Sequence, residues 1–120
     1  MGLFDVTQTA LEQALAGSAL REKALANNLA NANTPGFRRS DVDFQSALAS
    51  ALDTGSEVDQ VEQVAFSSVP DSAGAQRADG NNVQVDAEMA KLNENSVTYQ
   101  ALVAVAKARL NLISIAIGSR

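Results

Sequence analysis

Residues 85–117, VDAEMAKLNENSVTYQALVAVAKARLNLISIAI, carry a row of side chains at alternating spacings of four and three. Ser96 and the amphipathic Tyr99 are the exceptions in an otherwise apolar row. This heptad pattern is typical of a helix that packs lengthwise against another helix. We therefore expect a long C-terminal helix whose heptad row comprises Val85, Met89, Leu92, Ser96, Tyr99, Val103, Ala106, Leu110, Ile113 and Ile117.

A second apolar row lies about 100° around the same helix. Packing within one chain is the ordinary explanation of a single heptad row, but a helix apolar over so much of its girth needs more than one neighbour. Heterologous contacts between subunits would supply it. We assign Val103 and Leu110 to the chain's own N-terminal helix or its coiled-coil partner. To subunit interfaces we assign Leu102, Val105, Leu112 and Ile115 from this helix, and Leu20 from the N-terminal one.

An N-terminal helix is predicted over residues 3–32. Its apolar stripe recurs every seven residues, at Phe4, Leu11, Ser18, Leu25 and Ala32. Leu20 faces away from this stripe at ~100° per residue. Gly17 interrupts the helix at a cost of about 1 kcal/mol relative to alanine. The helix should end near Asn33, because Pro35-Gly36 suits the two central positions of a type II turn.

The middle of the chain is expected to be polar and largely irregular. A capping-box-like run at Ser40–Asp43 predicts a short helix over residues 41–52. Residues 53–82 lose helical periodicity, apart from one short strand expected at Gln63–Phe66, and should be mobile or ordered by a partner. The C-terminal helix should begin at an Asp86 cap and end at Gly118.

These elements predict an all-α fold, in which long N- and C-terminal helices form an antiparallel hairpin or coiled coil. Residues 1–33 and 83–120 would make the terminal-helix domain, and residues 34–82 the connecting segment. The net charge of −5 lies in the middle, since residues 41–82 carry eight acids and one base. The near-neutral ends could then pack against copies of themselves.

The composition argues against several classes of function. The chain contains no cysteine and no histidine, which removes thiolate and imidazole catalysis and most zinc sites. We expect no enzyme activity, cofactor, metal or small-molecule substrate. There is no basic patch for nucleic acid, and the most apolar stretch is too short to insert into a membrane. The N-terminus lacks the pattern of a cleavable signal peptide.

The segment LANNLANANTPGF, residues 25–37, resembles the N-terminal signature of the bacterial flagellar rod and hook proteins. Residues 80–101, GNNVQVDAEMAKLNENSVTYQA, are similar to the other characteristic end of that family. Among short rod proteins, the proximal rod type fits best, and another short rod protein or a generic type III-secreted helical hairpin is the alternative. The matching signature positions are Ala26, Asn27, Asn28, Ala30, Asn31, Thr34, Pro35, Gly36 and Phe37.

The resemblance implies a structural subunit that assembles helically into the periplasmic rod of the basal body and serves motility. Its partners would be other rod subunits and the rod-to-membrane-ring adaptor. The resemblance also implies that the chain leaves the cytoplasm through the flagellar type III export apparatus, without a cleaved signal peptide.

Two sets of candidate residues have alternative explanations. Asn27, Asn28 and Asn31 would either set the packing register of the helices or simply mark a polar helix end. Phe44 and Leu48 resemble an apolar element recognised at the export gate. Packing of these two side chains against the long helices is at least as good an explanation.

Overall fold

The computed structural model describes residues 5–53, 58–72 and 74–118. The elements follow the order α1 (Val6–Ala30), β1 (Ser40–Asp41), α2 (Phe44–Asp53), α3 (Val58–Glu62), β2 (Val69–Pro70) and α4 (Val85–Ala116). Most of the chain is helical, and the two long terminal helices pack against each other as the sequence predicts. Phe4, residues 54–57 and 73 of the polar middle, and the C-terminal residues 119–120 lie outside the described residues.

Helix α1 begins at a side-chain cap and buries one stripe. The carboxylate of Asp5 accepts a hydrogen bond from the backbone N–H of Gln8 at 2.9 Å, which satisfies one of the free donors of the first turn. The predicted seven-residue stripe is confirmed over the described residues, because its members from Leu11 onward are buried. These are Leu11, Ser18, Leu25 and, just beyond the helix, Ala32.

The predicted turn follows α1. The Phe37 N–H donates to the Thr34 carbonyl at 3.2 Å, and Gly36 has a φ of 73°. A positive φ at the third residue is the requirement of a type II turn and is met most easily by glycine.

The short helix α2 begins three residues later than predicted. Asp43 is its cap, with a carboxylate oxygen 3.2 Å from the Ser46 N–H. Ser40 cannot cap it, because both backbone groups of Ser40 bind the Asn28 side chain and Ser40–Asp41 forms β1. The strand predicted at Gln63–Phe66 is wrong. The strand that pairs antiparallel with β1 is β2, at residues 69–70.

Helix α4 begins at Val85 with Gln84 as its N-cap, so the predicted Asp86 cap lies in the first turn instead. An acidic side chain there still favours the helix, because it faces the positive end of the helix dipole. The predicted end is confirmed at Gly118, which has a φ of 78°.

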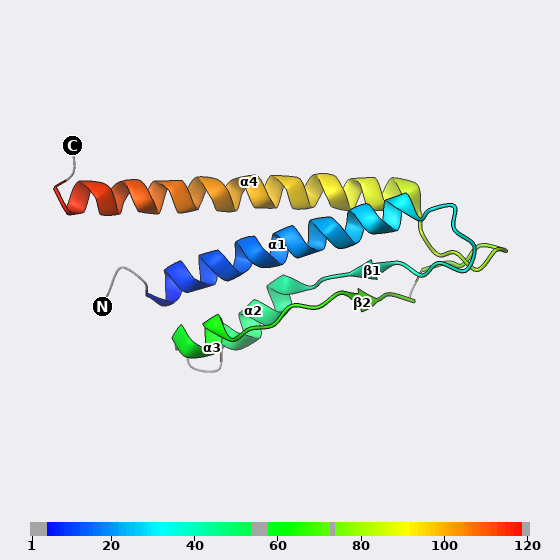
Figure 1. Ribbon diagram of the computed structural model, residues 1–120, viewed down its shortest axis with the longest axis horizontal. Helices are drawn as coiled ribbons and strands as arrows, with labels where there is room; N and C mark the ends of the chain where they lie inside the picture. The colour runs from blue at the N-terminus through cyan, green and yellow to red at the C-terminus, as the bar shows by residue number, and fades with distance from the viewer. Residues whose placement is uncertain (1–4, 54–57, 73, 119–120) are drawn as a thin grey trace.

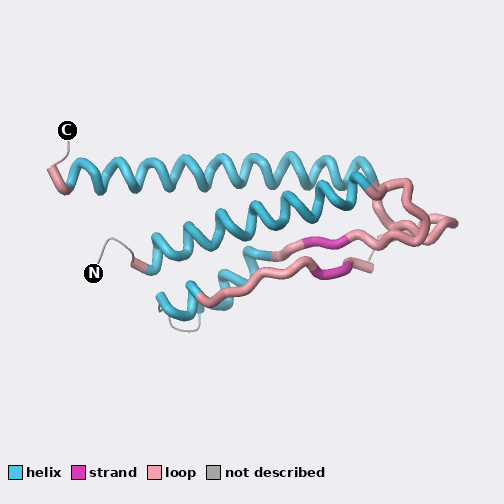
Figure 2. The backbone as a smooth tube through the Cα atoms, in the orientation of Figure 1, coloured by secondary structure: helices cyan, strands magenta, loops and turns pink. Residues whose placement is uncertain are grey.

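The molecule is a flat stack of three layers (Figure 1). Helix α1 is the middle layer, α4 runs antiparallel along one side of it, and β1, α2, α3 and β2 cover the other side. We call this third layer, residues 40–53 and 58–72, the arm. Figure 2 shows that the chain extends along α1 from β1 to α2 and then reverses, so that the segment from α3 to β2 lies beside the segment from β1 to α2. The Cα extents are 62 × 32 × 14 Å, so each layer is about one element thick.

The apolar core lies between α1 and the arm. Ala14 and Ala24 of α1 meet Val42 and Phe44, and the core is completed by half-buried side chains from three layers: Leu20, Leu48, Phe66 and Leu102. The rings of Phe44 and Phe66 meet edge to face, with centroids 6.3 Å apart. The arm is therefore more ordered than the irregular middle segment expected from sequence, and Val61 of α3 is fully buried.

Candidate assembly site

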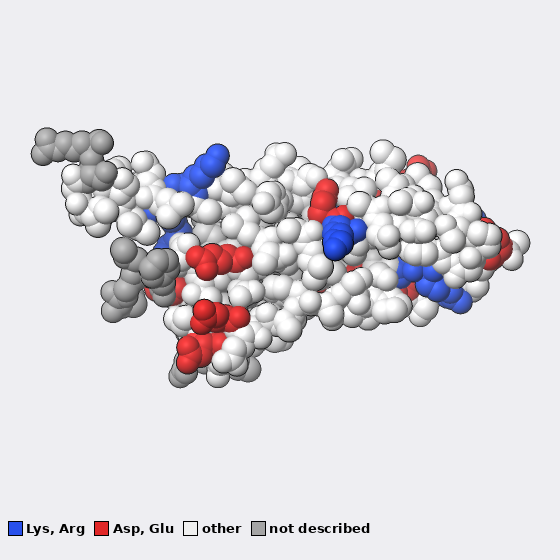
Figure 3. Space-filling model, viewed as in Figure 1, with Lys and Arg blue, Asp and Glu red and all other residues white. Residues whose placement is uncertain are grey.

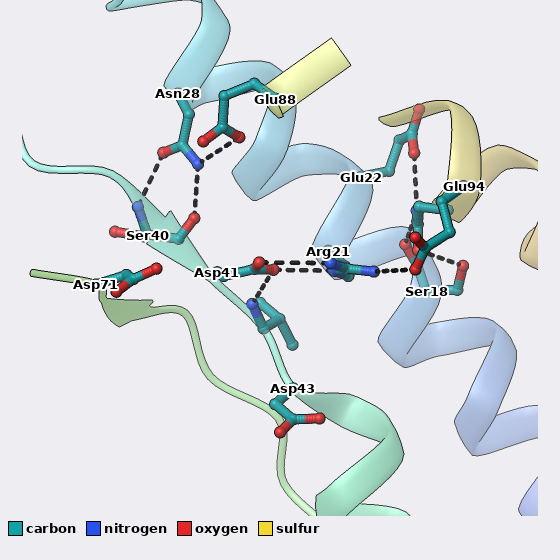
Figure 4. Close-up of polar contacts among 12 residues, drawn as sticks. Ser18, Arg21, Glu22, Asn28, Ser40, Asp41, Asp43, Asp71, Glu88 and Glu94 are labelled. Carbon is teal, nitrogen blue, oxygen red and sulfur yellow. Dashed lines mark hydrogen bonds and ion pairs between the residues drawn. The ribbon is translucent and has the colours of Figure 1, made fainter. Parts of the chain in front are cut away.

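The two segments that carry the family resemblance meet at one end of the molecule. Asn28 of α1 donates from Nδ2 to the Ser40 carbonyl at 2.7 Å and to Glu88 Oε2 at 3.2 Å, while its Oδ1 accepts from the Ser40 N–H at 2.9 Å (Figure 4). One amide thus joins α1, β1 and the first turn of α4. We call the surrounding cluster the polar junction: Asn28, Arg39, Ser40, Asp41, Asp71, Asn81, Asn82 and Glu88.

Arg39 is the charged centre of the polar junction. Its guanidinium binds Glu88 of α4, Asp71 and Asp41, and it is only 5% exposed. Burial by itself would lower the pKa of the Arg39 guanidinium. The hydrogen bonds and charges of Glu88 and Asp41 outweigh burial and raise this pKa above its ordinary value, so the side chain stays cationic.

Asparagines complete the junction by binding backbone groups. Asn82 accepts from the Arg39 N–H at 2.7 Å and donates to the Asp71 carbonyl at 2.6 Å. Asn81 donates to the carbonyls of Asn31 and Thr34 at 2.9 and 2.8 Å, which holds the end of α1. In the described part of the chain, no buried side-chain nitrogen or oxygen is left without a hydrogen-bond partner.

Arg21 of α1 makes a second link between the layers. Its Nε lies 2.9 Å from Asp41 Oδ1 on the arm, and its Nη1 lies 3.9 Å from Glu94 Oε1 on α4 (Figure 4). Burial alone would raise the pKa of the Asp41 carboxyl. The hydrogen bonds from Arg21 and the Val42 N–H dominate and lower that pKa, so Asp41 is held ionised.

An open groove of about 590 Å³ lies beside these ion pairs. Its walls include Arg21, Asp41, Asp71 and Glu94. A general acid at neutral pH requires a carboxyl with a raised pKa, whereas the pKa of Asp41 is lowered. Among the residues that the structure describes, no group of acidic side chains is arranged to hold a metal ion. Three of the carboxylates that line the groove, those of Asp41, Asp71 and Glu94, are ion-paired.

The signature residues fall into two sets. Asn28, Asn31, Thr34, Gly36 and Phe37 have contacts that shape the end of α1 and its turn. Asn31 donates to the Asn27 carbonyl at 2.8 Å, as a polar helix end would. The remaining signature positions lie on the surface: Ala26, Asn27, Ala30 and Pro35.

The face that α4 turns toward α1 differs from the predicted heptad row. The buried residues of described α4 are Glu88 and Asn95, and Leu102 and Arg109 follow at the same seven-residue spacing. Of the predicted row, Leu92, Ser96, Val103, Ala106 and Ile113 are half-buried. The others are exposed: Val85, Met89, Tyr99, Leu110 and Ile117.

Leu110 illustrates the difference: of the two neighbours predicted for it, the chain's own N-terminal helix or a coiled-coil partner, the first does not cover it, since it is 59% exposed. Glu88 and Asn95 occupy the buried row because α1 and Arg39 offer them hydrogen-bond partners, which no apolar periodicity reveals. Polar side chains at three of the four heptad-spaced positions 88, 95, 102 and 109 are the sequence signal that could have identified this row.

The residues predicted to lie at subunit interfaces also divide into half-buried and exposed side chains. Leu20 and Leu102, expected at subunit interfaces, are half-buried and pack against the chain's own core. Val105, Leu112 and Ile115 remain on the surface, and Val97 extends their row by two turns. Leu112 and Ile115 are 64% and 62% exposed. We call Val97, Val105, Leu112 and Ile115 the outer face of α4.

Phe44 and Leu48, the proposed export element, both belong to the core between α1 and the arm. Phe44 is buried against Gly17, where a Cβ would lie 2.4 Å from Phe44 Cβ. The packing explanation therefore accounts for the place of both side chains in the folded chain.

Comparisons with known proteins identify relatives of this chain. A family described as flagella basal body rod protein matches residues 7–38, which include the signature segment. The flagellar basal body rod protein FlgB of Bacillus subtilis is 36% identical over 111 residues, which cover 86% of this chain and 86% of that protein. The chain belongs to the flagellar basal body rod protein family.

Two further relatives extend this result. FlgB of Escherichia coli K12 is 32% identical over 105 residues, covering 74% of this chain and 76% of the relative. FlgB of Borrelia hermsii is 28% identical over 116 residues, covering 82% and 86%. These relatives support the proximal rod type over the other short rod protein considered from sequence.

The rod-family chain is a structural subunit of the proximal rod and belongs to the flagellar basal body. Within the described residues, no helix is long and apolar enough to cross a bilayer. The two segments that resemble the rod and hook proteins, residues 25–37 and 80–101, therefore both contribute side chains to the polar junction.

Proposed function

We propose that the chain assembles helically with other rod subunits and that the outer face of α4 is its main contact surface. The single observation that carries this proposal is the exposure of Val97, Val105, Leu112 and Ile115, which are all more than half exposed. Large apolar side chains exposed together along one helix face are typical of a protein–protein interface.

The layer order explains why this surface needs a neighbour. Helix α4 is an outside layer and touches α1 on one side, while the arm lies beyond α1 (Figure 1). Charged side chains in the view of Figure 3 gather over the α2–α3 end of the arm, whereas the edge formed by α4 is mostly uncharged. A contact between unlike surfaces on successive copies need not close into a ring, and where it does not close it builds a helix.

A charge placed on the outer face tests the proposal. Leu112→Asp should leave the helix content of the dilute chain unchanged, because the side chain is exposed there, and should abolish rod assembly and motility. An unpaired carboxylate buried at an interface costs on the order of 2–7 kcal/mol. Ser50→Asp adds the same charge at an exposed position of α2, on the far side of α1 from the outer face, and should assemble normally. Normal motility of Leu112→Asp would contradict the proposal.

We further propose that the rod-to-membrane-ring adaptor is a partner and that the chain reaches the periplasm through the flagellar type III export apparatus without loss of a signal peptide. Membership of the rod family supports these assignments. Recognition before folding would leave Phe44 and Leu48 accessible, so their burial in the folded chain is compatible with a role in export.

Export and packing can be separated by two phenylalanine variants. Phe44→Ala removes the proposed export element and part of the core, whereas Phe66→Ala removes the ring that contacts Phe44 and leaves the element intact. If Phe44 serves export, secretion should fall in Phe44→Ala and persist in Phe66→Ala. Equal secretion of the two variants would assign Phe44 to packing alone.

A further inference from the structure

The α1-facing row of α4 is polar at three of four heptad positions. Glu88, Asn95, Leu102 and Arg109 succeed one another at intervals of seven, and Leu102 is the apolar member. The large apolar side chains of the outer face point away from α1. The pairing of the two helices therefore depends on directional contacts more than on a continuous apolar seam.

Each polar member of this row has its own partners on the opposite layers. Glu88 binds Asn28 and Arg39 at the polar junction. Arg109 lies 3.2 Å from both Asp5 Oδ1 and Gln8 Oε1, at the start of α1.

Between these two contacts lies a buried polar layer. Asn95 donates to the Ser18 carbonyl at 2.9 Å and to Glu22 Oε2 at 2.7 Å, and accepts from Ser18 Oγ at 3.2 Å. Asn95 and Ser18 are almost fully buried. A buried polar layer of this kind can specify helix register at a cost in stability.

A shift of one heptad would mismatch every layer. Seven residues correspond to a slide of about 10 Å along the helix. Moved in one direction, Glu88 would meet Ser18 beside the carboxylate of Glu22. Moved in the other, Asn95 would take the place of Glu88 beside Asn28 and Arg39, and Leu102 would face Ser18 and Glu22 and leave their polar groups without partners. Buried polar groups without partners are costly, so both shifted arrangements are disfavoured.

We infer that Glu88, Asn95 and Arg109 are the register-setting residues of the α1–α4 pair. They select the one alignment that brings the two signature segments together and leaves Val97, Val105, Leu112 and Ile115 outside. This inference concerns the pairing within one chain and stands independently of the proposed function.

Spin-label distances measure the register directly. The chain contains no cysteine, so cysteines introduced at the exposed positions Glu12 and Ala90 can be labelled without interference. These positions are offset along the helix axes, so a slide of the helices changes the distance between labels. The labelled chain should give one distance population at a concentration where circular dichroism shows the helices formed.

The test variant replaces the whole polar row, as Glu88→Leu, Asn95→Leu and Arg109→Leu together. It should keep its helix content and gain a second population shifted by about 10 Å, the length of one heptad. The matched control carries Asn93→Leu, Gln100→Leu and Lys107→Leu, which add the same residues at exposed positions with the same spacing. This control should keep the single distance.

A conservative exchange, Ser18→Asn with Asn95→Ser, retains a polar layer and should also keep the single distance. A single unshifted population in the polar-row variant would overturn the inference. Loss of helix in that variant would overturn it too, because the row would then be required for folding and not for the choice of register. Motility is not the readout, so the proposed assembly surface can fail while this inference stands.

Discussion

Gly17 lies in the middle of α1 at the point where Phe44 crosses the helix. In an exposed helix, alanine in place of glycine stabilises by about 1 kcal/mol. Here the added Cβ would stand 2.4 Å from Phe44 Cβ and 2.7 Å from its Cγ, far inside van der Waals contact. The glycine therefore allows the arm to approach α1, and the sequence showed only its cost to the helix.

Gly17→Ala should accordingly destabilise the folded chain. Overpacking of this kind costs typically about 1–3 kcal/mol, so the midpoint of urea unfolding should fall. Gly74→Ala is the control, because a Cβ there meets only the Asn82 carbonyl oxygen, at an ordinary distance of 3.8 Å. A rise in the unfolding midpoint of Gly17→Ala would show that the arm does not pack on α1 as described.

Asp41 makes stability depend on pH. Its pKa in the folded chain is lowered from the ordinary value of 3.8, because the contacts with Arg21 and Val42 outweigh burial. Because the Asp41 carboxyl has a lower pKa in the folded chain than in the unfolded chain, its ionised form stabilises the fold, and this stabilisation is fully present above pH 3.8. The stabilisation is lost as the pH falls below 3.8 and through the lower pKa of the folded chain.

The prediction is that Asp41→Asn loses less stability than the unchanged chain on acidification through this range, although it is less stable at neutral pH. Denaturant unfolding at a series of pH values measures the difference. Asp53→Asn, at the exposed end of α2, is the control and should follow the unchanged chain. Identical pH profiles for Asp41→Asn and the unchanged chain would refute the role of this ion pair.

At the scale of elements, the sequence predicted which segments are long helices but not which face of α4 is inside. Apolar periodicity assigned Val103 and Leu110 to α1 or to a coiled-coil partner, whereas the row that the structure turns toward α1 is Glu88, Asn95, Leu102 and Arg109. The stripe of α1 was predicted correctly, because its buried members are small or apolar. The row of α4 was missed, because polar partners 49 to 104 residues away decide it.

The two faces of α4 should respond differently to truncation. Leu102→Ala should destabilise the monomer by about 1–2 kcal/mol, since a half-buried leucine loses part of its burial in the core. Leu110→Ala should leave the monomer nearly unchanged, because its side chain is already exposed. Thermal unfolding followed by circular dichroism compares the two. A larger loss in Leu110→Ala would restore the face predicted from sequence.

At the scale of the molecule, the arm is the part that sequence could not place. Its acidic composition and scattered serines are typical of a solvated segment, yet Asp71 of the arm binds Arg39 and Asn82, Ser40 binds Asn28 of α1, and Val61 is buried. These contacts join residues more than ten positions apart in the chain, and no local pattern encodes them. What remains exposed is the opposite side of the stack, where α4 has no second neighbour among the described elements.

This asymmetry predicts a gradient of stability along α4. Its buried residues, Glu88 and Asn95, both lie in the first half of the helix, and the outer-face leucine and isoleucine lie in the second half. Few buried contacts mean low free energies of local opening. In the dilute monomer, amide hydrogen exchange should therefore be slow over residues 88–102 and fast over residues 105–116, with assembly slowing the second range. Uniform protection of α4 in a confirmed monomer would contradict this, because the chain alone would then supply the burial that we assign to neighbouring subunits.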